Sequence, residues 1–155
     1  MLSRRLVQII EDHAEQLARG LIDDLRSNNR TPHYHQLSRE EIHLRTYGVY
    51  RNLGRWLNDE TESAIESSYT QLGKTRLAEG IPLNEIVYSL GLTKNHLLEH
   101  IHFSGMVDSA VELHGDRELQ RLVGRFFDKA VYYTVKGFEQ EAGWQHPSRS
   151  LQRAA

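Results

Sequence analysis

The stretch Leu77-Ala-Glu-Gly-Ile-Pro-Leu-Asn-Glu-Ile-Val-Tyr-Ser-Leu90 ends one helix and begins another within a few residues. Gly80 suits the cap at a helix C-terminus, because glycine adopts the left-handed conformation required there without a steric penalty. Pro82 suits the first turn of the next helix, where its missing N–H group would have no partner within the helix. The stretch therefore predicts two consecutive helices joined by a short turn.

Apolar residues recur at helical spacing on both sides of this turn. Their intervals of three, four and seven residues place them on one face of a helix, while polar residues occupy the other positions. The helix before the turn is predicted to begin near residue 60, and the helix after it to continue to about residue 101. The expected buried positions are Ile65, Tyr69, Leu72 and Leu77 before the turn and Leu83, Ile86, Val87, Leu90, Leu97, Leu98 and Ile101 after it.

The N-terminal third predicts two further helices. The first runs from Leu2 to about Ser27, and Pro32 marks the loop that follows it. The second begins at Ser38, because Ser38-Arg-Glu-Glu41 is a capping box in which the serine hydroxyl and the glutamate carboxylate each bind a backbone N–H group. This helix is expected to continue through Leu44, Tyr47, Leu53 and Trp56 to about Leu57.

The last third predicts a short helix from Val107 to Leu113 and a turn at His114-Gly-Asp116. A long amphipathic helix follows and ends near Ala142. No stretch alternates between apolar and polar residues as a half-buried strand does. The chain is therefore expected to form one all-α sensory domain over residues 1–143, either a globin-like fold or a compact bundle of five to six helices, with a flexible tail over residues 144–155.

Composition restricts the class of protein and its compartment. The 155 residues include no cysteine, which excludes disulfides and thiolate metal sites and favours a reducing compartment such as the cytoplasm. No apolar run approaches the roughly 18 residues that a membrane span requires. Nineteen Lys and Arg against 21 Asp and Glu give a net charge of −2, whereas a domain that binds nucleic acid usually carries a basic excess. The sequence therefore argues against a membrane or a nucleic acid as partner.

The pattern His96-Leu-Leu-Glu99-His100 matches the inverted zinc-protease motif. On a helix the two histidines lie one turn apart, so both imidazoles could face one metal ion, with Glu99 as the base. Such an enzyme also requires a third ligand and a substrate cleft, and short motifs arise by chance in a chain with nine histidines. A small metalloenzyme is therefore kept only as an alternative, and no residue is assigned as catalytic or metal-binding.

A second group of histidines, His33, His35 and His43, lies in and after the loop around Pro32. Histidine changes its charge near neutral pH, so residues of this kind can sense protons or bind a metal. Solvated loop histidines without a task are the more common case. The sequence leaves the role of this group open.

The stretch from Ile81 to Ile101 has the outline of a DNA-reading helix-turn-helix, with a turn at Gly91 and a second helix starting at Thr93. That second helix would carry Lys94 as its only basic residue, and Val87 fills a position near the turn where two helices press together and a small residue is expected. One continuous helix is therefore preferred, since a glycine inside a helix costs only about 1 kcal/mol relative to alanine. A DNA-binding regulator is kept as an alternative.

Two parts of the chain resemble a known family. Leu72-Gly-Lys-Thr-Arg-Leu-Ala-Glu-Gly-Ile-Pro-Leu-Asn-Glu-Ile-Val-Tyr-Ser-Leu90, followed by Leu92-Thr-Lys-Asn-His-Leu97, resembles the Arg-x-x-x-Gly-Ile-Pro-Leu signature of the RsbRD-type N-terminal domain. The stretch Arg125-Phe-Phe-Asp-Lys-Ala-Val-Tyr-Tyr-Thr-Val-Lys-Gly-Phe-Glu139 is similar to the last helix of that family. The resemblance extends from the first helix to about Ala142.

The resemblance implies a dimeric, globin-like helical domain without haem, of the kind found in bacterial stressosome co-antagonists and some histidine kinases. In related haem-binding sensor globins a proximal histidine precedes a glycine by four residues, and in this sequence Tyr69 takes that position before Gly73. No cofactor is therefore expected, although a haem or small-ligand sensor globin that uses His96 or His100 instead is an alternative. The resemblance predicts a non-catalytic signalling module that forms a homodimer, and the long last helix is the expected interface with the second copy and with a protein signalling partner.

Overall fold

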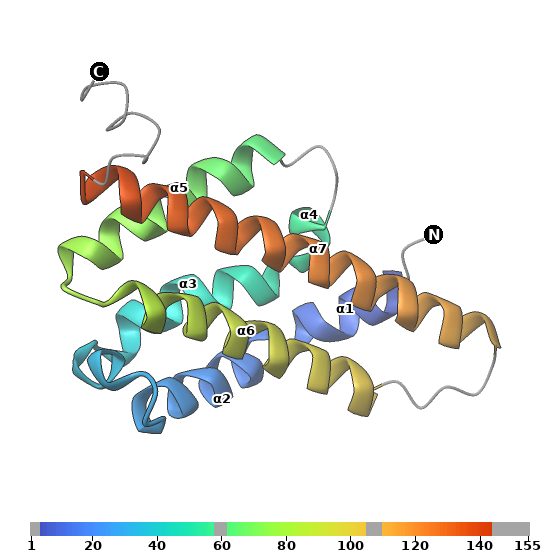
Figure 1. Cartoon of the computed structure of the whole chain (residues 1–155). Helices are drawn as coiled ribbons and strands as arrows, with labels where there is room; N and C mark the ends of the chain where they lie inside the picture. Colours follow the sequence, from blue (N-terminus) through green and yellow to red (C-terminus); the bar gives the residue numbers. More distant parts are fainter. Residues whose placement is uncertain (1–3, 58–61, 105–109, 144–155) are drawn as a thin grey trace, which may run out of the picture.

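A computed structural model of the chain describes residues 4–57, 62–104 and 110–143 (Figure 1). The described residues contain seven α-helices, one short 3-10 helix and no strand, so the expected all-α helical bundle is confirmed. None of the described helices combines the length and the apolar character needed to cross a membrane. The elements are α1 (Arg4–Asp12), α2 (Ala14–Ser27), η1 (Pro32–Gln36), α3 (Arg39–Arg51), α4 (Leu53–Trp56), α5 (Glu62–Ala78), α6 (Leu83–Ser104) and α7 (Ala110–Glu141).

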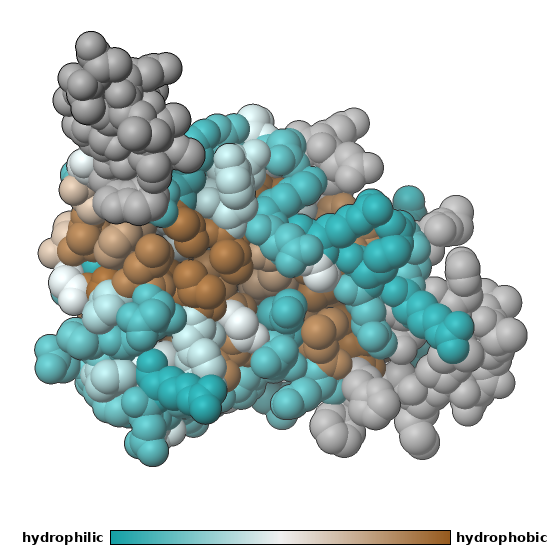
Figure 2. Space-filling model, viewed as in Figure 1, coloured by the Kyte–Doolittle hydropathy of each residue, from teal (hydrophilic) through white to brown (hydrophobic). Residues whose placement is uncertain are grey.

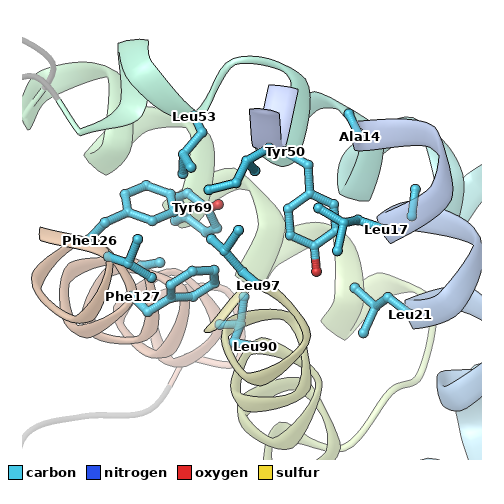
Figure 3. Close-up of a cluster of buried hydrophobic side chains, with 14 of the residues drawn as sticks. Ala14, Leu17, Leu21, Tyr50, Leu53, Tyr69, Leu90, Leu97, Phe126 and Phe127 are labelled. Carbon is cyan, nitrogen blue, oxygen red and sulfur yellow. The ribbon is translucent and has the colours of Figure 1, made fainter. Parts of the chain in front are cut away.

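The longest helix, α7, lies along one side of the molecule and packs against α5 and α6, while α2 packs against α3 and α6 (Figure 1). The apolar faces of these helices meet in one core. Figure 3 shows Tyr69 of α5 beside Phe126 of α7, with ring centroids 5.7 Å apart, and Tyr50 of α3 on the side of Leu17 and Leu21 of α2. Side chains from the beginning, middle and end of the chain therefore share a single core.

Helices α5 and α7 touch through their backbones. A Cβ atom placed on Gly73 would lie 2.1 Å from the carbonyl oxygen of Thr134, and one placed on Gly137 would lie 2.1 Å from the carbonyl oxygen of Thr70. Atoms cannot approach that closely, so only glycine fits at these two positions. The glycines bring the two helix axes nearer than ordinary side chains would allow.

The turn between α5 and α6 has the geometry that the sequence predicts. Gly80 has a φ of +77°, in the left-handed region, and the Ile81 N–H donates to the Arg76 carbonyl at 3.0 Å. This bond satisfies one of the last carbonyls of α5, as in other glycine-capped helices. Pro82 directly precedes Leu83, the first residue of α6.

The capping box at the start of α3 is also confirmed. The Glu41 N–H donates to Ser38 Oγ at 3.2 Å, and the Ser38 N–H donates to Glu41 Oε2 at 3.4 Å. The expected single helix to Leu57 is wrong, however, because α3 ends at Arg51 and α4 begins after Asn52. The Asn52 side chain donates to the Gly48 carbonyl at 3.0 Å, a local bond that competes with regular helix geometry.

Two other helix boundaries differ from the sequence-based expectation. The expected first helix is divided at His13, whose Nδ1 bonds the Ile9 carbonyl at 2.6 Å while its backbone N–H is shared between two carbonyls. The expected turn at His114-Gly-Asp116 is wrong, since α7 is continuous from Ala110. A single glycine lowers helix stability by only about 1 kcal/mol, which tertiary packing along so long a helix offsets. The remaining part of the expected helix at Val107 and the expected tail at 144–155 lie outside the described residues.

Several expected core positions are not fully buried. Leu44, placed by periodicity on the apolar stripe of α3, is 79% exposed. Leu77 at the end of α5 is only partly buried, and so are Leu83, Val87 and Leu98 of α6. The position of Leu44 is explained by what lies beside it, since its side chain lines an open cavity.

Candidate functional site

A cavity of about 260 Å³ lies between α3 and α5, with α6 and η1 contributing to its walls. Apolar side chains line most of it, including Ile42, Val49, Leu72 and Leu90. The exposed Leu44 is at its open side. A concave, mostly apolar space with a few polar groups is the usual form of a small-molecule site.

Arg76 of α5 is one of two guanidinium groups in the cavity wall. The residue is only 5% exposed, and its Nη1 donates to Glu79 Oε2 at 2.7 Å. Its guanidinium carbon lies 5.5 Å from the ring centroid of Tyr34, within cation–π range. The Nε atom of Arg76 is buried and has no hydrogen-bond partner among the described residues. A buried donor without a partner is uncommon and needs an explanation.

Arg45 of α3 is the second guanidinium in the cavity wall. It is half-buried, and no hydrogen bond or ion pair joins it to the residues that the structure describes. Burial and the nearby positive charge of Arg76 lower the pKa of Arg45, although a guanidinium still keeps its proton at physiological pH. Two cations therefore face the same partly desolvated space, and of the two only Arg76 forms an ion pair with a carboxylate among the described residues.

A buried hydroxyl pair lies near the arginines. Tyr34 of η1 and Ser89 of α6 share a hydrogen bond of 2.9 Å between their hydroxyl oxygens, and Ser89 also donates to the Ile86 carbonyl at 2.6 Å. Burial raises the pKa of Tyr34, and the positive charge of Arg76 opposes this only in part. Tyr34 therefore stays a neutral hydroxyl in the cavity wall.

The part of the wall contributed by Trp56 and Tyr69 is aromatic. Trp56 lies with its ring centroid 6.1 Å from Tyr69 and 5.8 Å from Phe126, and Tyr69 is buried, which raises its pKa. The contact between Trp56 and Tyr69 is edge-to-face, a geometry that stabilises aromatic clusters. The cavity is therefore polar beside Arg45 and Arg76 and apolar beside Trp56.

The sequence contains a signal for Arg76, which combines helical periodicity with charge. Arg76 follows Ile65, Tyr69 and Leu72 at intervals of four, three and four, so it continues the buried stripe of α5. A charged residue on such a stripe is rarely buried unless it is paired or functional. Arg45 has no comparable signal, because only the packing of α3 against the rest of the bundle shows what it faces.

The histidines of the zinc-protease pattern are directed to different partners. His96 Nε2 donates to Asp24 Oδ2 of α2 at 2.9 Å. Burial tends to raise the pKa of Asp24, but hydrogen bonds from His96 and Asn28 outweigh it and lower that pKa. Glu99 is exposed. In the described part of the chain, no three histidine or acidic side chains are grouped as metal ligands.

His100, the second histidine of that pattern, packs against His13, with ring centroids 5.3 Å apart. Its Nε2 is buried and without a hydrogen-bond partner in the described residues. Burial, and then the charge of His13, lower the pKa of His100, so the neutral form is favoured. His100 is therefore a packing residue between α1 and α6 in this arrangement.

His33, His35 and His43 do not converge. His33 contacts the buried Glu85 of α6 with both its ring and its backbone N–H, which donates to Glu85 Oε1 at 2.9 Å. His35 Nε2 donates to the Asn28 carbonyl at 2.9 Å. His43 Nε2 donates to Glu15 Oε2 at 2.7 Å, and this hydrogen bond lowers the pKa of Glu15. Each histidine thus forms a hydrogen bond with a different part of the chain.

The helix-turn-helix and haem alternatives also meet structural obstacles. Helix α6 runs through Gly91 without a turn, and Thr93, the expected start of a DNA-reading helix, is buried and donates to the Ser89 carbonyl at 2.8 Å. The cavity of about 260 Å³ is too small for a haem, and its described lining residues include no histidine. Tyr69, at the position of the missing proximal histidine, is part of the cavity wall.

The residues that line the cavity include groups that can bind a ligand. Guanidinium and hydroxyl groups can donate hydrogen bonds to an anion, and the apolar walls can cover a hydrocarbon group. The described residues that line it include no carboxylate or imidazole to act as a general base. Comparisons of the chain with protein-family models, curated proteins and solved structures found no match.

Proposed function

We propose that the chain is a non-catalytic sensory module that binds a small molecule between α3 and α5 and signals through α7. The observation that supports this most directly is the cavity, because Arg45 and Arg76 converge on it while most of its wall is apolar. The resemblance of the sequence to the RsbRD-type N-terminal domain supports a signalling role, with the cytoplasm as its compartment. The cavity provides the input that such a role requires.

Helix α5 connects the cavity to α7, because it lines the cavity and also packs against α7. Tyr69, Leu72 and Arg76 of α5 line the cavity. Gly73, between them in sequence, is in backbone contact with α7. Because no side chain separates the two helices there, α5 cannot shift or tilt without moving α7. Packed helices of this kind pass small displacements on as rigid units.

We further propose that α7 contacts a second copy of the chain. Figure 2 shows apolar side chains gathered where the first half of α6 lies beside the second half of α7. Exposed apolar surface that is continuous over two helices is typical of an interaction site. Homodimerisation agrees with the family resemblance, and a protein signalling partner would then read the dimer. Partly exposed apolar residues on these two half-helices are Leu83, Val87, Val131, Val135 and Phe138.

Sedimentation velocity at micromolar concentration tests the dimer. The wild type should sediment as a dimer, and Val135→Glu should shift it to monomer, because a carboxylate in an apolar interface is strongly disfavoured. Arg125→Gln is the matched control, since it makes the same change in net charge at an exposed position of α7. A monomeric wild type, or equal loss of dimer in both variants, would show that α7 is not the interface.

A further inference from the structure

The chemistry of the ligand can be inferred from how charge is distributed along the cavity; this inference rests on the proposed function. Arg45 of α3 lies seven residues before Asn52, which directly follows that helix. Tyr69 lies seven residues before Arg76 on α5, which corresponds to about 10 Å along the helix. The two arginines influence each other electrostatically, and Trp56 contacts Tyr69. The cavity therefore has a cationic end beside Arg45 and Arg76 and an aromatic end beside Trp56, and the charge of Arg45 also acts on Tyr69.

The cationic end carries one positive charge in excess. Arg45 and Arg76 contribute two positive charges, and Glu79, which lies 2.7 Å from Arg76, contributes one negative charge. Arg45 and the Nε atom of Arg76 have hydrogen-bond capacity that the described residues do not use. A carboxylate fits this end, because it carries a single charge and accepts from guanidinium groups in a planar geometry.

The size and lining of the cavity limit the rest of the ligand. At about 30 Å³ for each water-sized group, the volume of about 260 Å³ holds on the order of nine such groups. Leu72, Val49 and Trp56 are among the apolar residues that line the cavity. Most of the wall area is apolar, although Asn52, Ser68 and Tyr69 also line the cavity, so a second charged group would lose more to desolvation than it gains.

We propose that the cavity binds a monocarboxylate with an apolar tail, on the order of ten non-hydrogen atoms in all. Its carboxylate lies between Arg45 and Arg76, and its tail extends along Leu72 toward Trp56. The buried Nε atom of Arg76 then gains an acceptor, and the exposed Leu44 covers the tail at the open side.

Titration of the full chain with octanoate tests this proposal. The variant Trp144→Phe leaves Trp56 as the sole tryptophan, so its fluorescence reports on the apolar end of the cavity. Octanoate should bind with one-to-one saturation. Two related probes should each bind at least about tenfold more weakly than octanoate. Octan-1-ol has the same tail but loses the hydrogen bonds to a charged group. Acetate keeps the charge but loses the burial of an apolar tail.

Variants of the cationic end give a second, independent set of outcomes. Arg45→Gln should weaken octanoate binding by about tenfold or more and leave octan-1-ol binding unchanged. Arg45→Lys should bind octanoate with an affinity between those of the wild type and Arg45→Gln, because it keeps the charge but not the planar donor pair. Glu79→Gln should strengthen octanoate binding, because it removes the negative charge that partly neutralises the cationic end. Arg55→Gln, an exposed change in α4, is the control and should leave both affinities unchanged.

Three results would overturn the proposal. If octan-1-ol binds as tightly as octanoate, the cavity is a site for neutral apolar molecules, and the proposed sensory function stands without a carboxylate. If octanoate binds but Arg45→Gln has no effect, the carboxylate lies elsewhere. If none of the three probes changes Trp56 fluorescence or binds in calorimetry, both the carboxylate ligand and the proposed function are contradicted.

Discussion

At the scale of residues, the guanidinium groups of Arg45 and Arg76 face the same desolvated space. A helical bundle with only a structural role would not be expected to have this feature. Arginines are seldom buried without full pairing, because removing their charge from water is costly. Arg76 is almost completely buried with one carboxylate, and Arg45 is half-buried with no bonded partner in the described residues. Residues that are unfavourable for folding and converge on a cavity are expected where a ligand binds.

The substitution Arg45→Met tests this interpretation without any ligand. Methionine fills similar space but removes the repulsion of Arg76 and the desolvation of a charge, so the free energy of unfolding should rise by about 0.5–2 kcal/mol. Urea unfolding followed by circular dichroism measures this change. An arginine retained for stability would instead give a less stable variant.

His100 makes the stability of the fold depend on pH. Its pKa is lowered in the folded chain by burial and by His13, so the unfolded chain takes up a proton that the folded chain does not. As the pH falls below the ordinary histidine value of about 6.5, this residue should therefore reduce the free energy of unfolding until the lowered pKa is reached. His100→Gln should flatten that decline in urea unfolding measured from pH 7.5 to 5.5. Parallel curves for the two proteins would contradict the burial of His100.

At the scale of elements, the contact between α5 and α7 depends on two glycines. Gly73 and Gly137 each leave no room for a Cβ atom against the backbone of the other helix. Gly91, in the middle of α6, has nothing within 4 Å of the position of an added Cβ. The same substitution should therefore have opposite effects at these sites.

Gly73→Ala should destabilise the protein by about 3 kcal/mol or more, because the helices must separate to admit the methyl group. Gly91→Ala should stabilise it by up to about 1 kcal/mol, since alanine is the better helix former and meets no obstacle. Chemical unfolding of both variants under one set of conditions provides the comparison. A mild effect at Gly73 would show that α5 can slide on α7, and the proposed route of signalling would then be lost.

The boundaries of the helices show which features the sequence can and cannot predict. The capping box at Ser38 and the turn at Gly80 were predictable because each depends on bonds among neighbouring residues. The divisions at His13 and Asn52 were not, since both side chains are compatible with a continuous helix until one of their local bonds forms. The exposure of Leu44 was hidden for a different reason, because periodicity identifies an apolar stripe but not the cavity beside it.

At the scale of the whole molecule, the cavity is a product of long-range packing. Its wall combines residues from Leu25 in α2 to Thr93 in α6, and the arginines come from two helices that are not adjacent in sequence. Arg76 could be recognised as an unusual member of an apolar stripe, but its approach to Arg45 depends on the docking of α3 against α5. The site was therefore not predictable from one sequence, whereas the helical class was.

In the proposed function, a molecule bound between α3 and α5 changes the packing or dynamics of α7. Hydrogen exchange of the wild type, read by mass spectrometry with and without saturating octanoate, tests both parts of that claim at once. We expect slower amide exchange in α3 and α5 where they line the cavity, together with an altered exchange rate in the half of α7 that contacts Gly73. Saturable binding that leaves α3, α5 and α7 unchanged, or that alters only the outer surface of the bundle, would contradict it.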